Sequence, residues 1–92
     1  MNNKEEIIKA MGMGMSNDPE TIKLANSLLV ELCPDYFDYS EYFGMSRSTL
    51  DSMWYYNDYY YFHYYIIRFR NKYFPGLIYS PYTKTFKGYV GS

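Results

Sequence analysis

Apolar residues recur at helical spacing in the first third of the chain, separated by polar and charged positions. The segment from Asn3 to Met11 is expected to form a short helix, because Glu5 and Glu6 occupy its first turn, where negative charge complements the helix dipole. The Gly12-Met13-Gly14-Met15 segment that follows is interpreted as a flexible hinge, since glycine adopts many backbone conformations.

The second helix has the strongest start signal in the sequence. Asn17 or Asp18 suits the N-cap, Pro19 suits the first helical position and Glu20 suits the first turn. Cys33-Pro34 should end this helix. The apolar residues in between form the i, i+3, i+4, i+7 stripe of a helix that faces a core: Ile22, Leu24, Ala25, Leu28, Leu29 and Leu32.

Two further helices are expected in the middle of the chain. Asp35 is placed to cap a short helix from Tyr36 to Phe43. Another helix is expected to begin at Ser46 or Ser48, with Asp51 three residues after Ser48 as in a capping box.

From Tyr55 to Tyr73 the apolar residues occupy every helical angle, which predicts a helix that must be covered on several sides. We expect it to continue the helix that begins at Ser46, unless Asn57-Asp58 interrupts it and Asp58 caps a new helix. A strand from Tyr59 to Arg70 is the alternative, because Tyr, Phe and Ile favour strands. We favour the helix, since basic residues suit its C-terminal end: Arg68, Arg70 and Lys72.

Phe74-Pro75-Gly76 predicts a turn, followed by an extended tail or one short hairpin. The expected fold is therefore mainly α: a small domain of three to four helices with one long aromatic helix and this extended or hairpin tail. We divide the single domain, residues 1–92, into four parts: a short helix and Gly/Met hinge (1–15), a helical core (17–56), the aromatic helix (57–73) and the tail (74–92).

The composition is unusually aromatic, with 14 tyrosines, 6 phenylalanines and 1 tryptophan among 92 residues. A domain of this size cannot enclose so many rings and also give every buried phenol hydroxyl a partner. Many tyrosines must therefore lie at the surface, where tyrosine is typical of protein interfaces.

The charges are unevenly distributed along the chain. Up to Gly44 there are three lysines against eight acidic residues, a balance of −5, whereas from Met45 onward six basic residues face two acidic ones, a balance of +4. A chain with this charge pattern can pair head to tail with a copy of itself or bind two different partners.

Few residues suit catalysis or a cofactor. Cys33 and His63 are too few and too far apart for a zinc site, and neither a nucleotide-binding loop nor a G-x-S-x-G nucleophile motif occurs. We expect no enzymatic activity, cofactor, metal or small-molecule substrate. His63 is expected to be either hydrogen-bonded within the fold or half-buried, and Cys33 to be a small buried hydrophobic residue.

No membrane association is expected, because the longest apolar stretch, Tyr59 to Ile67, contains His63 and is far shorter than the roughly 20 residues of a membrane span. The single cysteine and the charged N-terminus indicate a cytoplasmic protein, or one carried in a particle assembled in the cytoplasm. Residues with AT-rich codons are frequent, which hints at a phage or its host.

Residues 39–54, from Tyr39 to Trp54, resemble the helix-turn-helix motif of bacterial and phage regulators. Ser40 matches the small residue where the two helices of that motif cross, and Gly44 matches the glycine that opens its turn. The resemblance implies that a set of residues would face the major groove of DNA: Ser46, Arg47, Ser48, Asp51, Ser52 and Tyr55. Electrostatics opposes DNA binding, because the motif's one arginine is flanked by acidic residues: Asp35, Asp38, Glu41 and Asp51.

The aromatic run itself has three interpretations: an ordinary core, a protein interface and a surface on which single-stranded nucleic acid stacks. We favour an interface made of aromatic anchors and arginines: Trp54, Tyr55, Tyr59, Tyr61, Tyr64, Arg68 and Arg70. The sequence thus predicts a non-catalytic interaction or assembly subunit that self-associates or docks onto a larger protein, and the codon hint favours a phage as its source. A helix-turn-helix DNA-binding regulator is the alternative.

Overall fold

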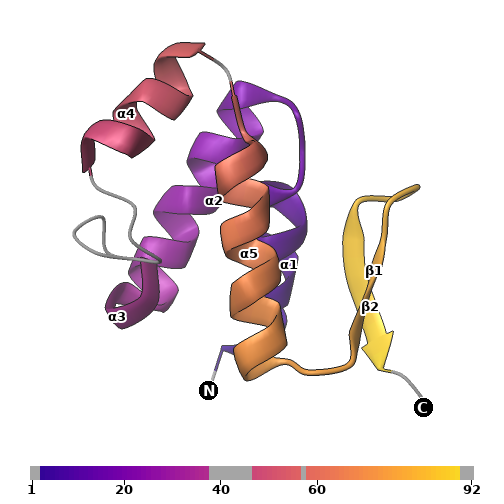
Figure 1. Cartoon of the computed structure of the whole chain (residues 1–92). Helices are drawn as coiled ribbons and strands as arrows, with labels where there is room; N and C mark the ends of the chain where they lie inside the picture. The colour runs from indigo at the N-terminus through magenta and orange to yellow at the C-terminus, as the bar shows by residue number, and fades with distance from the viewer. Residues whose placement is uncertain (1–2, 38–46, 57, 90–92) are drawn as a thin grey trace.

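The computed structural model describes residues 3–37, 47–56 and 58–89, and it confirms a mainly helical domain with a small C-terminal hairpin (Figure 1). Helix α1 (Lys4–Gly14) packs beside α2 (Pro19–Leu32), and α5 (Tyr60–Tyr73) packs against α1. The short helix α3 (Pro34–Phe37) follows α2, and α4 (Arg47–Tyr56) stands at the upper left of Figure 1. Strands β1 (Leu77–Ser80) and β2 (Thr85–Tyr89) form the hairpin, and β2 contacts α1.

The predicted start of the second helix is confirmed at Asp18, the N-cap of α2. Its carboxylate accepts hydrogen bonds from the Thr21 hydroxyl at 2.7 Å and from the Thr21 backbone N–H at 3.0 Å. These two bonds hold the pKa of Asp18 below its usual value, because they stabilise the charged carboxylate. The helix ends at Leu32, as predicted, and Pro34 begins α3.

The predicted hinge at Gly12 and Gly14 is wrong, because α1 continues through both residues and both are buried. A Cβ atom on Gly14 would clash with the Ile66 Cδ1 atom and would lie 3.0 Å from Cε1 of Phe62, both on α5. A Cβ atom on Gly12 would lie 3.1 Å from the carbonyl oxygen of Lys84 in the hairpin. The glycines therefore allow α1 to approach two neighbouring elements closely.

Residues 60–73 form a helix and not a strand, but this helix does not continue from the preceding one. Helix α4 ends at Tyr56, and the backbone N–H of Asp58 donates to the Met53 carbonyl at 3.1 Å. The Asp58 carboxylate then accepts a hydrogen bond of 3.3 Å from the Tyr60 N–H, in the first turn of α5. The expectation of one long helix from Ser46 is thus corrected to two helices, as the alternative proposed, but the N-cap residue of α5 is Tyr59 and not Asp58.

The tail forms the short hairpin, with Tyr79 opposite Phe86 and an irregularity in the register between Leu77 and Tyr79. The Arg70 guanidinium joins the hairpin to α5, because its Nη1 donates to the Leu77 carbonyl at 2.6 Å. Of the predicted short helix 36–43, only α3 falls within the described residues, and it begins earlier, at Pro34.

Rings from α3 and α5 make up much of the core. Phe69 is fully buried, and its ring centroid lies 4.6 Å from that of Tyr36 and 4.9 Å from that of Phe37, both in edge-on contacts. Tyr65 is buried beside them, and its hydroxyl donates to the Tyr36 carbonyl at 2.5 Å. This hydrogen bond holds α3 against α5.

We expect Tyr65→Phe to lower the free energy of unfolding by about 1 kcal/mol, because it removes the donor to the Tyr36 carbonyl and keeps the ring. The measurement is urea unfolding followed by circular dichroism. Tyr64→Phe is the matched control, since Tyr64 precedes Tyr65 on the same helix and is 52% exposed. Equal effects of the two substitutions would contradict a structural role for the Tyr65 hydroxyl.

Candidate interaction surface

Five tyrosines near the junction of α4 and α5 are strongly exposed, and we call them the tyrosine band. Their side chains are 52–80% exposed: Tyr55 and Tyr56 at the end of α4, and Tyr60, Tyr61 and Tyr64 on α5. The rings of Tyr60 and Tyr61 meet edge to face, 5.7 Å apart, so part of each ring rests on its neighbour. The prediction that many tyrosines lie at the surface is confirmed.

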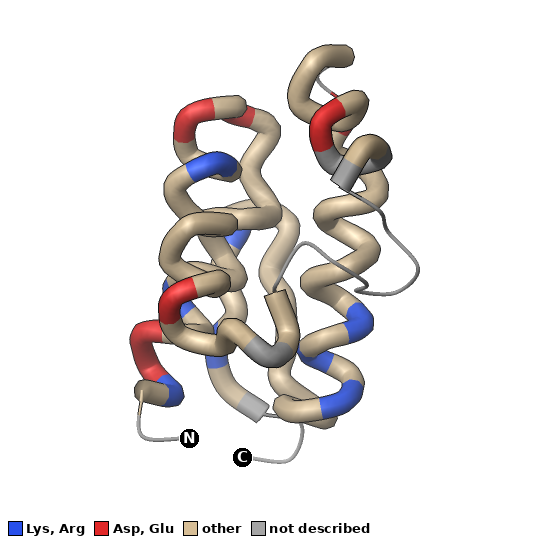
Figure 2. Tube along the Cα trace, turned by 90° about the vertical axis from the view of Figure 1, so that its left-hand side faces the viewer, with Lys and Arg blue, Asp and Glu red and all other residues tan. Residues whose placement is uncertain are grey.

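The band changes into a basic surface along α5. Tyr60, Tyr64, Arg68 and Lys72 follow one another at intervals of four residues, and all four are exposed, so they share one outer face of the helix. The Arg68 guanidinium lies 5.8 Å from the centre of the Tyr64 ring. The basic residues gather at the lower end of α5 in Figure 2.

Three of the seven residues predicted for the interface help to hold the fold together. Tyr59 is 7% exposed, because it precedes α5 as its N-cap residue and points into the core. Trp54 is half-buried, with its ring 5.8 Å from Tyr59 and 6.1 Å from Phe62. Arg70 is half-buried beside the hairpin. The placement of Tyr59 and Arg70 on an exposed surface is therefore corrected.

Four predicted residues do lie at the exposed face: Tyr55, Tyr61, Tyr64 and Arg68. Sequence reasoning missed Tyr56 and Tyr60, which are 73% and 69% exposed. The four-residue spacing of Tyr60, Tyr64 and Arg68 is a signal that would have identified Tyr60. No comparable signal marks Tyr56.

The residues implied by the helix-turn-helix resemblance are only partly described. Ser48, Ser52 and Tyr55 are exposed on α4, together with the acidic Asp51. Ser46 lies outside the described residues, as do the Arg47 side chain and the residues matched to the crossing and turn of the motif, Ser40 and Gly44. The described part of α4 therefore presents hydroxyl groups and a carboxylate.

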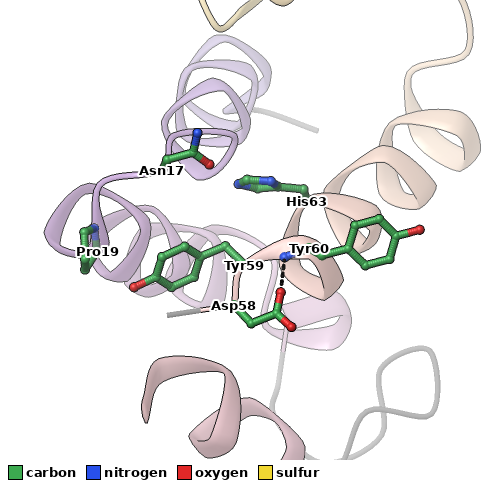
Figure 3. Close-up of a pocket in the computed structure, with 6 residues that line it drawn as sticks. All are labelled: Asn17, Pro19, Asp58, Tyr59, Tyr60 and His63. Carbon is green, nitrogen blue, oxygen red and sulfur yellow. Dashed lines mark hydrogen bonds between the residues drawn. The ribbon is translucent and has the colours of Figure 1, made fainter. Parts of the chain in front are cut away.

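A groove of about 530 Å³ with a mixed polar and apolar lining lies between the N-terminal ends of α2 and α5 (Figure 3). His63 Nε2 donates to the Ser16 carbonyl at 2.8 Å, which ties the α1–α2 connection to α5. The side chain is half-buried, so the prediction of a hydrogen-bonded or half-buried histidine is confirmed. The Tyr59 ring extends toward Pro19, whereas the Tyr60 ring points away from it. His63 and Tyr59 thus hold the start of α5 against the α1–α2 connection and the beginning of α2.

Reactive groups are sparse in the part of the chain that the structure describes. Cys33 is half-buried, and burial raises the pKa of its thiol, which disfavours the nucleophilic thiolate. Among residues 3–37, 47–56 and 58–89, no group of three His, Cys, Asp or Glu side chains is placed to hold a metal ion. No helix within these ranges combines the length and hydrophobicity that a membrane crossing requires.

Comparisons with protein families, characterised proteins and solved structures give no match for this chain, so function is inferred from its own surface.

Proposed function

We propose that this chain is a non-catalytic protein-interaction or assembly subunit that binds its partner through the tyrosine band and the adjoining basic end of α5. The observation that carries this proposal is the exposure of five large rings, 52–80% each, on consecutive helices. A phage-encoded assembly in the cytoplasm is the setting that the sequence favours.

The energetics support binding at this surface. Fully burying a large apolar side chain contributes roughly 1.5–3 kcal/mol, so a partner that covers several of these rings gains enough to offset part of the cost of association. Tyrosine loses little conformational freedom on binding and keeps a hydroxyl for a hydrogen bond, and Arg68 adds a charged anchor.

The test uses a band variant, Tyr60→Ser with Tyr61→Ser and Tyr64→Ser, in a selection of peptides from a displayed random library. We expect peptides enriched on the wild-type chain to lose at least tenfold in affinity for the band variant. Tyr82→Ser is the matched control, because Tyr82 is 97% exposed in the turn between the strands and outside the band. Both variants should have the same midpoint of urea unfolding as the wild type, which would show that the fold is intact.

Peptides that bind wild-type chain and band variant equally would contradict the proposal. The alternative, a DNA-binding regulator, is tested on the same proteins by titration with duplex DNA at low and high salt. Salt-sensitive DNA binding that is lost in Ser48→Glu with Ser52→Glu would favour that alternative, because these two hydroxyl side chains are exposed on α4.

A further inference from the structure

We infer that the partner of this surface is a second copy of the chain, which receives the outer face of α5 in the groove between α1 and α2. The inference rests on the proposed function and identifies the partner of the same site. It is carried by a groove whose apolar lining and excess of acidic side chains complement the exposed face of α5.

The groove has a volume of about 480 Å³ and lies along the sides of α1 and α2. Its apolar lining includes Met13, Leu24 and Leu28, and Leu24 is 53% exposed, which is high for a leucine within an amphipathic helix. Glu6 and Glu31 also line it, together with one basic residue, Lys9. The groove is therefore apolar with an acidic excess.

The groove and the α5 face lie on different sides of the molecule. On α1 the core is contacted by Ile7, Met11 and Gly14, whereas Glu6 and Met13 lie on a separate helical face. The core side of α1 packs against Phe62 and Ile66 of α5, so the groove opens away from α5. Figure 2 shows the first two helices on the left, with acidic residues and some lysines among them, and the basic end of α5 on the right.

The α5 face has the features that such a groove recognises. A helix that docks in a groove uses residues spaced by three, four and seven positions, and Tyr60, Tyr61, Tyr64 and Arg68 have this spacing. The tyrosine rings match the apolar lining, and Arg68 and Lys72 are opposite in charge to Glu6 and Glu31. Among the described residues, the two surfaces thus carry opposite charge excesses: two acidic side chains and one basic one line the groove, whereas Arg68 and Lys72 lie on the α5 face.

The groove of one copy binds the α5 face of another copy, and these are two different surfaces on opposite sides of the molecule. The contact is therefore heterologous. Each copy retains a vacant groove at one end and a vacant α5 face at the other, so further copies add until a ring closes or a filament grows. This arrangement is expected of a subunit that builds an assembly.

The experiment separates the two surfaces with one variant for each. Tyr64→Ser removes a ring from the α5 face, and Leu24→Lys places a positive charge in the lining of the groove. Both positions are more than half exposed, so the fold should persist. Mass is measured by analytical ultracentrifugation over a concentration series of the full chain. We expect wild-type protein to form oligomers that weaken with salt, and each variant alone to associate at least tenfold more weakly.

Mixing the variants gives the decisive result. The Tyr64→Ser chain keeps an intact groove and the Leu24→Lys chain keeps an intact α5 face, so one productive contact remains between them. We expect a 1:1 complex and no larger species, whereas Tyr82→Ser should assemble like the wild type. A mixture that stays monomeric, or oligomers that persist in either variant, would overturn the inference.

The failure of this inference is distinguishable from failure of the proposed function. A wild-type chain that is monomeric at all concentrations overturns self-association. If that chain still selects peptides through the tyrosine band, the interaction role stands and a different protein is the partner.

Discussion

Phe69→Ala is expected to lower the free energy of unfolding by about 3–5 kcal/mol, which is the largest loss that we expect from a single substitution in this chain. Phe69 is fully buried and contacts rings from three segments: Tyr36 and Phe37 in α3, Tyr73 in α5 and Phe74 after it. Truncation removes these contacts and leaves a cavity that rigid neighbouring rings fill poorly. A domain of this length has a total stability of roughly 5–14 kcal/mol, so the variant approaches the unfolding threshold.

Urea unfolding followed by circular dichroism measures this loss. Phe69→Leu is the control that keeps most of the apolar volume, and it should lose less than half as much stability. A loss below about 1 kcal/mol for Phe69→Ala would mean that this side chain is not enclosed as described.

Gly14→Ala is expected to destabilise the fold by about 1–2 kcal/mol, although alanine is the better helix former. The added methyl group would clash with the end of the Ile66 side chain and press on the Phe62 ring. Overpacking of this kind costs about 1–3 kcal/mol, and the gain of up to about 1 kcal/mol in helix propensity offsets part of it. A stabilised variant would contradict the close contact between α1 and α5.

A double-mutant cycle tests the proposed cause. Ile66→Val removes the Cδ1 atom that the new methyl group would meet. We therefore expect Gly14→Ala to cost less in the Ile66→Val background than in the wild type, with a coupling of about 1 kcal/mol. If the effects of Gly14→Ala and Ile66→Val were purely additive, the destabilisation by Gly14→Ala would come from a contact other than the one with Ile66.

The helix starts were predictable where local chemistry sets them. Asp18 and Pro19 define the beginning of α2 through a cap and a fixed backbone angle, and both signals depend on immediate neighbours. Gly12 and Gly14 were misinterpreted as a hinge because the need for glycine comes from residues far away in the sequence. Lys84 packs closely against Gly12, and Ile66 packs closely against Gly14. Glycine in a sequence indicates either freedom of the backbone or the close approach of a neighbour, and only the tertiary structure distinguishes the two.

The tyrosine-rich surface was predictable as a whole but not residue by residue. The number of rings requires exposure, whereas the choice of exposed rings depends on where one helix stops and the next begins. With the break at Asp58, Tyr59 falls before α5 and turns inward, while Tyr60 begins the outer face. Tyrosine is found both in cores and at surfaces, so its hydrophobicity does not predict which of these rings are buried and which are exposed.

The contact between α1 and β2 also affects the order in which the protein folds. Gly12 packs closely against the backbone of Lys84 and Thr85, which lie near the C-terminal end of the described chain. During synthesis on the ribosome, α1 and α2 can associate early, because their contacts are local. The side of α1 at Gly12 stays uncovered until the hairpin has emerged, so the nascent chain exposes a helix flank that the finished protein conceals.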